Sequence, residues 1–433
     1  MMSAWLGGAL LAGCAGAGSS ATSPAAALPA AAAHQAVVVP HGGVRRTQSV
    51  PSCSGLGNMA LVGGGFENVA DGEYSGVLEG DANEVCDEDS SIGGGYYNFV
   101  SSGSNTSYYS WIGSGYDNSI SGNGYQSVIG GGNVNALTAP NSVIGDGSQN
   151  TLSGSYSVIA GGSNNTLNSA ATYAFVGGGQ TNVLSSEYGV LVRGLNNTVS
   201  GEGAYIAAGG YNTASGEGAV VDGGFSSTAG RTFATIPGGY VNNAAGAYSF
   251  AAGARASALY TGDFVWSDGS DGDAILTSTA TYQFLARASG GFTLWTNAAS
   301  TVGAKLAAGS GTWASASDRN LKTDVARIDD AAVLDKVAAL PIERWSYKSE
   351  RGVRHVGPMA QDFYAAFGVG EDDKHITSID EDGVALAAIK ALHARVGALD
   401  AENARLRRRL AAEAAHDRRV DAELPHIVAV LHK

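Results

Sequence analysis

The segment SVIGGGNVNAL, residues 127–137, returns as SVIAGGSNNTL at residues 157–167, and its pattern repeats along much of the chain. An aliphatic residue stands third, glycines follow it, asparagine stands ninth and a second aliphatic residue closes the segment. Self-similarity at a fixed period indicates a repeat architecture. The first aliphatic residues, called centres here, lie mostly 15 positions apart, with steps of 20, 17 and 17: Val62, Val77, Ile92, Ile112, Ile129, Ile144, Ile159, Val176, Leu191, Ile206, Val221, Ile236 and Ala251.

Two further positions keep the same phase as these centres. Six residues after the centre stands an asparagine or, in two units, a serine: Asn68, Asn83, Asn98, Asn118, Asn135, Asn150, Asn165, Asn182, Asn197, Asn212, Ser227, Asn242 and Ser257. Eight residues after it stands a small or aliphatic residue: Ala70, Val85, Val100, Ile120, Leu137, Leu152, Leu167, Leu184, Val199, Ala214, Ala229, Ala244 and Leu259.

This pattern predicts a mainly β fold, a parallel β-roll or solenoid over residues 55–259. Glycine and asparagine tolerate the positive φ of tight turns, so each coil can hold two short strands joined by two turns. Stacked coils would pair each strand with its counterparts above and below. The inward residues are small, which suits a very thin solenoid or several chains packed around one axis.

The repeat segments resemble the head repeats of trimeric autotransporter adhesins. That resemblance implies left-handed parallel β-rolls assembled as a homotrimer. The repeat of this chain is one residue longer than is typical of those heads.

Composition and charge exclude several classes of protein. The 63 glycines and 15% charged residues do not fit one ordinary globular enzyme, while 44% hydrophobic residues argue against disorder. The first 316 residues carry a net charge of −12 and the remainder −2. Because an acidic body repels the nucleic-acid backbone, we expect no nucleic-acid partner.

The N-terminus predicts export. A short apolar run ends in Leu-Ala-Gly-Cys at residues 11–14, which resembles the lipobox of bacterial lipoproteins. The resemblance implies a signal peptide at 1–14 and a lipid on Cys14, although no Lys or Arg precedes the run. A plain secretory signal and an Ala-rich tail without a targeting role are the alternatives. Residues 15–54 are rich in Ala, Ser and Pro and predict a flexible tether.

Two cysteines and one acidic segment are candidate sites. Cys53 and Cys86 of an exported chain can form a disulfide worth about 3 kcal/mol in the chain-entropy model, and two unpaired buried thiols are the alternative. Neither has the spacing of zinc ligands, so no metal is predicted. DGSDGD, residues 268–273, has clustered carboxylates but lacks EF-hand spacing, so a solvated turn is favoured over a calcium site.

The chain changes character after the repeat. Residues 260–316 contain alternating and aromatic stretches bounded by glycines, such as DFVWSDG, and predict a β neck. From Ser317 onward the sequence is mixed and charged, and predicts a small α+β domain over 317–433. It begins with Ser-Asp-x-x-Leu-Lys, then places Leu340-Pro341 before an aromatic stretch and Gly357-x-x-Ala360-Gln361 after it.

These segments, in this order, resemble the C-terminal intramolecular chaperone of phage tailspikes, tail fibres and endosialidases, a family of self-cleaving serine peptidases. The resemblance implies that Ser317 attacks the carbonyl of Ala316 and that Lys322 is its base. A serine hydroxyl needs a neighbouring base, and lysine serves when burial keeps it neutral. Spacing alone would favour a helix-capping Ser317 and a surface Lys322, but the surrounding pattern favours cleavage.

The C-terminal segment predicts a coiled-coil helix. Apolar residues keep 4-3 spacing, which marks a seam able to associate with copies of itself, and an asparagine within it would fix the register. A helix buried in a globular domain is the alternative. The seam positions are Ala385, Ile389, Leu392, Val396, Leu399, Asn403, Leu406 and Leu410.

Together these patterns predict an exported homotrimeric fibre whose chaperone domain assembles it and cuts itself off, once per chain. No cofactor is predicted. We expect an outer-membrane, cell-surface or secreted protein that binds a host-surface glycan or matrix protein and touches the membrane only through its N-terminal lipid. A phage or prophage tail fibre, found in virions, is the alternative. A polysaccharide-degrading tailspike is disfavoured because carboxylates are scarce between Ser119 and Ser200.

Overall fold

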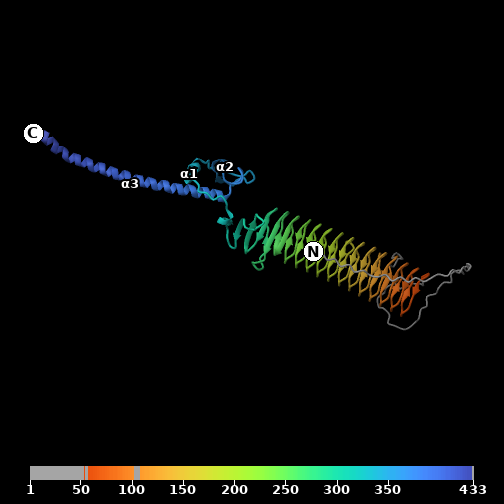
Figure 1. Cartoon of the computed structure of the whole chain (residues 1–433). Coiled ribbons are helices and arrows are strands. Elements are labelled where there is room, and N and C mark those ends of the chain that lie inside the picture. The colour runs from red at the N-terminus through yellow and green to blue at the C-terminus, as the bar shows by residue number, and fades with distance from the viewer. Residues whose placement is uncertain (1–52, 54–56, 102–107, 432–433) are drawn as a thin grey trace, which may run out of the picture. The chain divides into compact units, whose positions relative to one another are not determined.

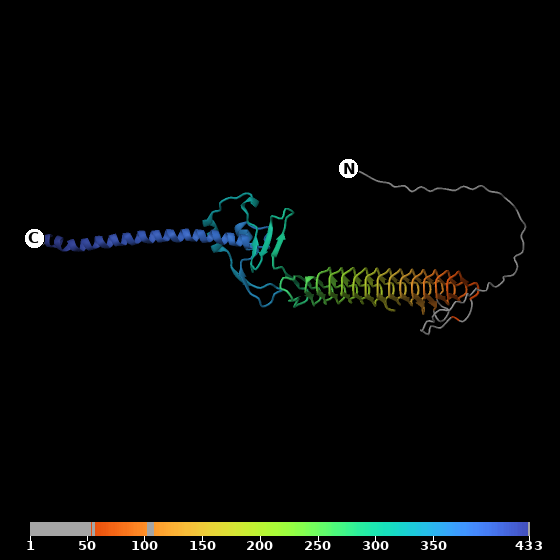
Figure 2. The ribbon, with the colours of Figure 1, turned by 90° about the horizontal axis from the view of Figure 1, so that it is seen from below.

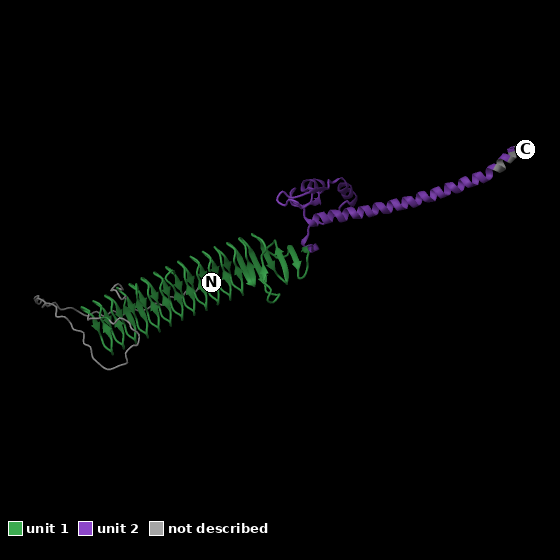
Figure 3. Cartoon of the chain, turned by 180° about the vertical axis from the view of Figure 1, so that it is seen from behind, with its two compact units in different colours: residues 1–315 green, residues 316–433 purple. Residues whose placement is uncertain are grey.

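The computed structural model describes residues 53, 57–101 and 108–431. The predicted signal peptide, Cys14 and nearly all of the tether lie outside these residues. The chain divides into two compact units between Ser315 and Ala316 (Figure 3). This boundary is one peptide bond away from the bond that the sequence predicts to be cut.

The first unit is a stack of coils that form two parallel sheets (Figures 1 and 2), as the sequence predicts. Sheet A comprises β1 (Leu61–Val62), β3 (Gly76–Val77), β5 (Ser91–Ile92), β7 (Trp111–Ile112), β9 (Val128–Ile129), β11 (Val143–Ile144), β13 (Val158–Ile159), β15 (Phe175–Val176), β17 (Val190–Leu191), β19 (Tyr205–Ile206), β21 (Val220–Val221), β23 (Thr235–Ile236), β25 (Phe250–Ala254), β27 (Phe264–Asp268) and β29 (Phe284–Arg287).

Sheet B runs along a second side of the stack. It comprises β2 (Val69–Ala70), β4 (Glu84–Val85), β6 (Phe99–Ser101), β8 (Ser119–Ser121), β10 (Ala136–Leu137), β12 (Thr151–Leu152), β14 (Thr166–Leu167), β16 (Val183–Leu184), β18 (Thr198–Val199), β20 (Thr213–Ala214), β22 (Thr228–Ala229), β24 (Asn243–Ala244), β26 (Ala256–Ala258) and β28 (Leu276–Thr277). Single-residue bridges, from Phe66–Asp81 to Tyr240–Ala254, form a third line of contact between coils.

The core is one file of inward side chains from each sheet. Ile129 of sheet A and Leu137 of sheet B are fully buried, and their equivalents are buried in almost every coil. Fully burying such a side chain stabilises a protein by about 1.5–3 kcal/mol. One chain therefore closes its own core, as expected of a very thin solenoid.

The asparagines form a continuous hydrogen-bonded ladder beside this core. The Oδ1 of Asn165 accepts from the backbone N–H of Asn182 at 3.1 Å and from its Nδ2 at 2.9 Å. The Nδ2 of Asn165 donates to the carbonyl of Gly179 at 3.0 Å. Where serine replaces asparagine, the Oγ of Ser227 accepts from the N–H of Asn242 at 3.2 Å. Each step thereby satisfies the buried polar groups of two adjacent coils.

A glycine in each turn permits the ladder. Gly162 has φ +98°, and a Cβ added there would lie 2.3 Å from the carbonyl oxygen of Gly179 in the next coil. Only glycine combines that conformation with so close an approach. The glycine three residues after each centre from Val62 to Ile236, and Gly253 two residues after Ala251, is therefore a requirement of the stacking.

The last predicted coil is one residue shorter than the sequence pattern indicates. Ala244 pairs with Ala258, and the N–H of Ala256 donates to the Oδ1 of Asn242 at 2.9 Å. Ala258 is thus the inward residue and Ala256 holds the asparagine position. The assignment of these positions to Leu259 and Ser257 is wrong, and Leu259 is 40% exposed.

Stacking continues into the predicted neck. β27 and β29 extend sheet A, and β28 extends sheet B. These coils lack the Gly/Asn signature, which is why the repeat is lost from the sequence there. An antiparallel sheet follows, made of β30 (Gly291–Trp295), β31 (Gly303–Ala307) and β32 (Trp313–Ser315).

The second unit is a small α+β domain with a long C-terminal helix. Its elements are the 3₁₀ turn η1 (Arg319–Leu321), α1 (Asp330–Ala339), β33 (Glu343–Trp345), β34 (His355–Gly357), α2 (Ala360–Phe367) and α3 (Ser378–Leu431). Strands β33 and β34 pair antiparallel. None of the described helices, α3 included, is apolar enough over a sufficient length to cross a membrane.

The ladder generates a stability prediction. Asn165→Ala removes the acceptor for two donors of Asn182, and a buried donor left unpaired costs about 1–3 kcal/mol. We expect a loss of about 2–4 kcal/mol in the free energy of unfolding, measured by denaturant titration. Asn165→Ser is the matched control, because serine serves at position 227; it should lose less. Equal losses in the two variants would contradict the role given to the side-chain acceptor.

Candidate functional site

The predicted nucleophile and base are in direct contact. The Nζ of Lys322 donates to the Oγ of Ser317 at 2.7 Å. The turn between them explains the contact: the carboxylate of Asp318 accepts from the N–H of Asn320 at 2.9 Å and begins η1. That turn carries Lys322 back over Ser317.

The same turn bears on whether Ser317 caps a helix or acts as a nucleophile, the two interpretations that the sequence leaves open. Asp318 caps η1, so Ser317 is not the capping residue. The capping role of Asp318 was not predicted from the sequence, although an Asp side chain commonly accepts from the backbone N–H two residues further along in such a turn.

Both side chains are exposed in a single chain. Every residue from Trp313 to Asp329 has an exposed surface, including Ala316 on the acyl side of the predicted bond. A lysine accepts a proton from serine only where its ammonium is poorly solvated. The two side chains are therefore within hydrogen-bonding distance of each other but are not desolvated within one chain.

The comparison with known families begins at this serine. Residues 317–368 match the family described as the chaperone of endosialidase. This match confirms the resemblance read from the C-terminal sequence, and its start coincides with Ser317. No curated protein matches the chain.

The matched segment includes the motifs that the sequence analysis singled out. Pro341 follows the end of α1 and precedes β33, whose Trp345 stacks on His355 of β34 at a centroid distance of 4.7 Å. β34 ends at Gly357, and Phe363 of α2 is buried, with its ring centroid 4.9 Å from that of Phe367. The match ends at Gly368, whose left-handed conformation terminates α2.

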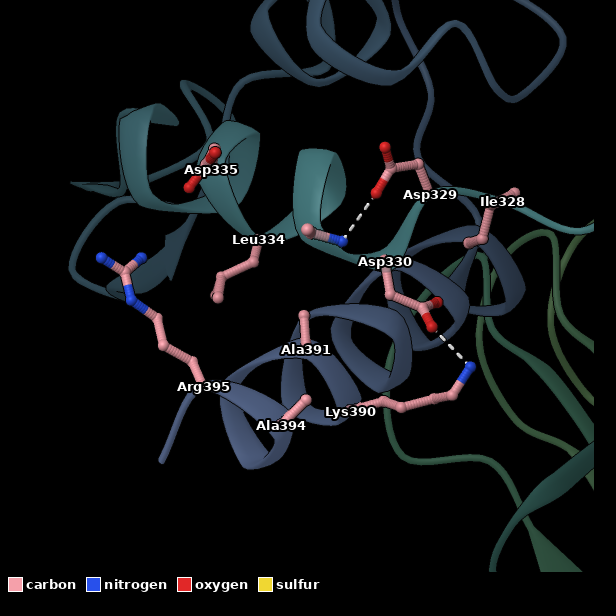
Figure 4. Close-up of a pocket in the computed structure, with 10 residues that line it drawn as sticks. Ile328, Asp329, Asp330, Leu334, Asp335, Lys390, Ala391, Ala394 and Arg395 are labelled. Atoms are coloured by element: carbon pink, nitrogen blue, oxygen red, sulfur yellow. Dashed lines mark hydrogen bonds and ion pairs between the residues drawn. The ribbon is translucent and has the colours of Figure 1, made fainter. Parts of the chain in front are cut away.

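A cavity of about 590 Å³ lies between α1 and the first half of α3 (Figure 4). Leu334, Ala391 and Ala394 line its apolar wall, and Asp330 pairs with Lys390 at its edge. Neither Ser317 nor Lys322 lines it. Sequence reasoning missed this cavity because its walls come from segments about sixty residues apart, as the Asp330–Lys390 separation shows.

The two described cysteines lie together at the N-terminal end of the first unit. Cys53 and Cys86 form a disulfide with a Cα–Cα distance of 5.5 Å. The N–H of Cys53 donates to the carboxylate of Glu84 at 3.2 Å. The sulfurs and this carboxylate lie within 4.8 Å of one another, but sulfurs joined in a disulfide are not metal ligands.

The DGSDGD segment is a turn whose carboxylates pair with arginines. Arg287 pairs with Asp268 and Asp271, and Arg255 pairs with Asp273. The N–H groups of Ser289 and Ser270 donate to Asp268 and hold the pKa of its carboxyl well below the usual range. Each carboxylate of the segment pairs with an arginine, as expected of a turn rather than of an open calcium site.

The low pKa of Asp268 predicts a pH dependence of stability. A carboxyl whose pKa is lowered in the folded state contributes stability above its unfolded pKa of about 3.9, and that contribution declines as the pH falls below it. Asp268→Asn should lower the free energy of unfolding at pH 7, and its difference from wild type should shrink below about pH 4. Denaturant titrations of both proteins at about pH 7 and about pH 3 measure this difference in the free energy of unfolding.

Asp222→Asn, at an exposed carboxylate of the same unit, is the control and should change stability little at either pH. A difference for Asp268→Asn that stays constant from pH 7 to pH 3 would contradict the assignment.

Proposed function

We propose that the chain is a homotrimeric fibre whose C-terminal domain assembles three copies and then releases itself by cutting the bond between Ala316 and Ser317. The observation that carries this proposal is the contact between Ser317 Oγ and Lys322 Nζ at the first residue of the family match. A chaperone-of-endosialidase domain joined to a β-solenoid fits a protein of the tail-fibre or tailspike kind.

The cleavage proceeds in two balanced steps. Lys322 Nζ, in its neutral form, takes the hydroxyl proton while Ser317 Oγ attacks the carbonyl carbon of Ala316. The carbon–nitrogen bond breaks, the proton passes to the departing amine of Ser317, and Ala316 is held as an ester on Oγ. Water then hydrolyses this ester, which leaves a carboxylate on Ala316 and a free amine and hydroxyl on Ser317.

Assembly of three copies would supply the exclusion of water that Ser317 and Lys322 lack in one chain. Helix α3 presents alanines to α1, where Ala387, Ala388 and Ala391 are buried. Its seam residues Leu392, Val396 and Leu399 stay about half exposed. Three copies joined along this seam would cover it, and we infer that a neighbouring copy also covers Ser317 and Lys322 and excludes water from them.

We further propose export and surface binding. The basis is the lipobox-like sequence ending at Cys14, which would anchor the fibre by a lipid in the outer membrane or at the cell surface. The repeated surface of the solenoid would then bind a host glycan or matrix protein. A phage or prophage tail fibre is the second candidate function, favoured by the family match itself.

Cleavage is tested on the intact 43.6 kDa chain. It should yield a C-terminal fragment that begins at Ser317, seen on a denaturing gel and by N-terminal sequencing. Ser317→Ala should abolish the fragment because the nucleophile is lost. Lys322→Arg should abolish it too, because arginine keeps the charge but cannot act as a base.

Matched controls lie close by in the sequence. Ser315→Ala and Lys336→Ala remove an exposed serine and an exposed lysine outside the pair and should leave cleavage unchanged. Fragment formation by Lys322→Arg at the wild-type rate would show that Lys322 is not the base.

Dependence of cleavage on assembly is tested at the seam of α3. Leu392→Asp combined with Leu399→Asp places like charges along three helices, so the variant should stay monomeric and uncleaved. Leu392→Met combined with Leu399→Met keeps the apolar seam and should trimerise and cleave. Sedimentation equilibrium and denaturing gels measure both properties, and efficient cleavage by a monomeric variant would refute the coupling.

A further inference from the structure

The outer faces of the two sheets differ in chemistry. In sheet A the outward residues form one file, and from Trp111 onward every member except Thr235 is aliphatic or aromatic. We call this file the apolar face: Leu61, Gly76, Ser91, Trp111, Val128, Val143, Val158, Phe175, Val190, Tyr205, Val220, Thr235, Phe250, Phe264 and Phe284.

The corresponding file of sheet B is polar along most of its length. We call it the threonine face: Val69, Glu84, Phe99, Ser119, Ala136, Thr151, Thr166, Val183, Thr198, Thr213, Thr228, Asn243 and Ser257. The two files share the same coils, strand length and backbone pairing, so strand formation alone does not explain the difference between them.

The apolar face carries no charged member, and its side chains are only partly covered within one chain. Val143 and Phe175 are 36% and 38% exposed, and Phe284 is 73% exposed. Its C-terminal end is a stack of rings, with centroids 4.6 Å apart between Phe250 and Phe264 and 4.8 Å apart between Phe264 and Phe284. A long, contiguous apolar strip on the surface of a protein marks an interaction site.

We propose that the apolar face is the surface by which copies of this chain contact one another, in parallel and in register, along the solenoid. The proposal rests on the homotrimer proposed above and specifies that the apolar face of each copy lies toward the three-fold axis. Helix α3 accounts for assembly in the second unit only, whereas this face joins the copies along the first.

The spacing of the residues on the apolar face indicates that its partner is a second copy of this chain. Its members recur once per coil, and residue size varies along it, from valines in the middle to three stacked phenylalanines at the C-terminal end. A second copy in parallel register offers the same spacing and the same residue sizes at every level. Because most strands are two residues wide, three such faces can close around an axis without leaving a channel.

The area of the face is small for any one pair of copies. Fifteen strands spaced about 4.8 Å apart and about 7 Å wide give on the order of 500 Å² per copy. A trimer would bury about 1,500 Å² over its three contacts, or about 500 Å² per pair, which is below the range of about 1,200–2,000 Å² for a stable interface between two partners. The face therefore suits a closed ring of three, in which each copy meets two neighbours, rather than a dimer.

Cysteine cross-linking of the full chain tests the face directly. Thr235 and Thr228 are both partly exposed outward threonines in consecutive strands, on the apolar and the threonine face respectively. Each is replaced by cysteine in a chain that also carries Cys14→Ser, so that the introduced thiol is the one free to pair, and Ser317→Ala, so that the chain stays intact. After mild oxidation, Thr235→Cys should give a band of twice the chain mass on a non-reducing gel, and Thr228→Cys should stay at the single mass.

Sedimentation equilibrium of the same samples separates this inference from the proposed function. A trimer in which Thr228→Cys cross-links as well as Thr235→Cys, or in which neither does, would keep the homotrimer and overturn the apolar face as its contact. A monomer would overturn both. A second variant pair, Val190→Lys and Thr198→Lys, places a charge on each face, and only Val190→Lys should reduce the cross-linking of Thr235→Cys, by about tenfold or more.

Discussion

The first unit depends on the asparagine ladder. Backbone pairing between two-residue strands offers few hydrogen bonds to define where one coil lies over the next, and the inward Val, Ile and Leu side chains fix only which face of each strand turns inward. The side chain of Asn165 fixes that position, because its oxygen receives both the main-chain and the side-chain donors of Asn182. A shift by one residue would leave buried donors unpaired at every coil.

The same arrangement explains why such a chain benefits from a separate assembly domain. The strand pairing and the asparagine ladder join residues about a coil apart, so a coil gains little stability until its neighbour is in place. A long helix such as α3 forms from local contacts instead and can bring copies together early. In the proposed assembly, its apolar seam and the apolar face of sheet A would act at two stages: the seam until Ser317 cuts, and the apolar face afterwards.

Much of the fold can be predicted from residue spacing, because the centres and asparagines repeat with the period of the coil. The pattern fails in two places. Ala256 takes the asparagine position in a shorter coil. β27 and β29 stack through Phe264 and Phe284, in coils that lack the Gly/Asn signature. At the candidate site the residue types are evident from sequence, but the contact between Ser317 and Lys322 depends on the turn that Asp318 begins. The cavity beside Lys390 and the pairing of Arg287 with Asp268 are contacts across long separations that no local pattern encodes.

Because the coils are so alike, the solenoid can change in length by the gain or loss of whole coils. Most coils carry one centre, one glycine turn and one asparagine, and such a coil presents to the coil above the same donors and acceptors that it receives from the coil below. Duplication or loss of a whole coil would therefore leave both new neighbours with a complete set of partners, and the steps of 17 and 20 residues show that extra residues are accommodated between coils. Selection on the length of the solenoid can then act in steps of one coil, each about 4.8 Å.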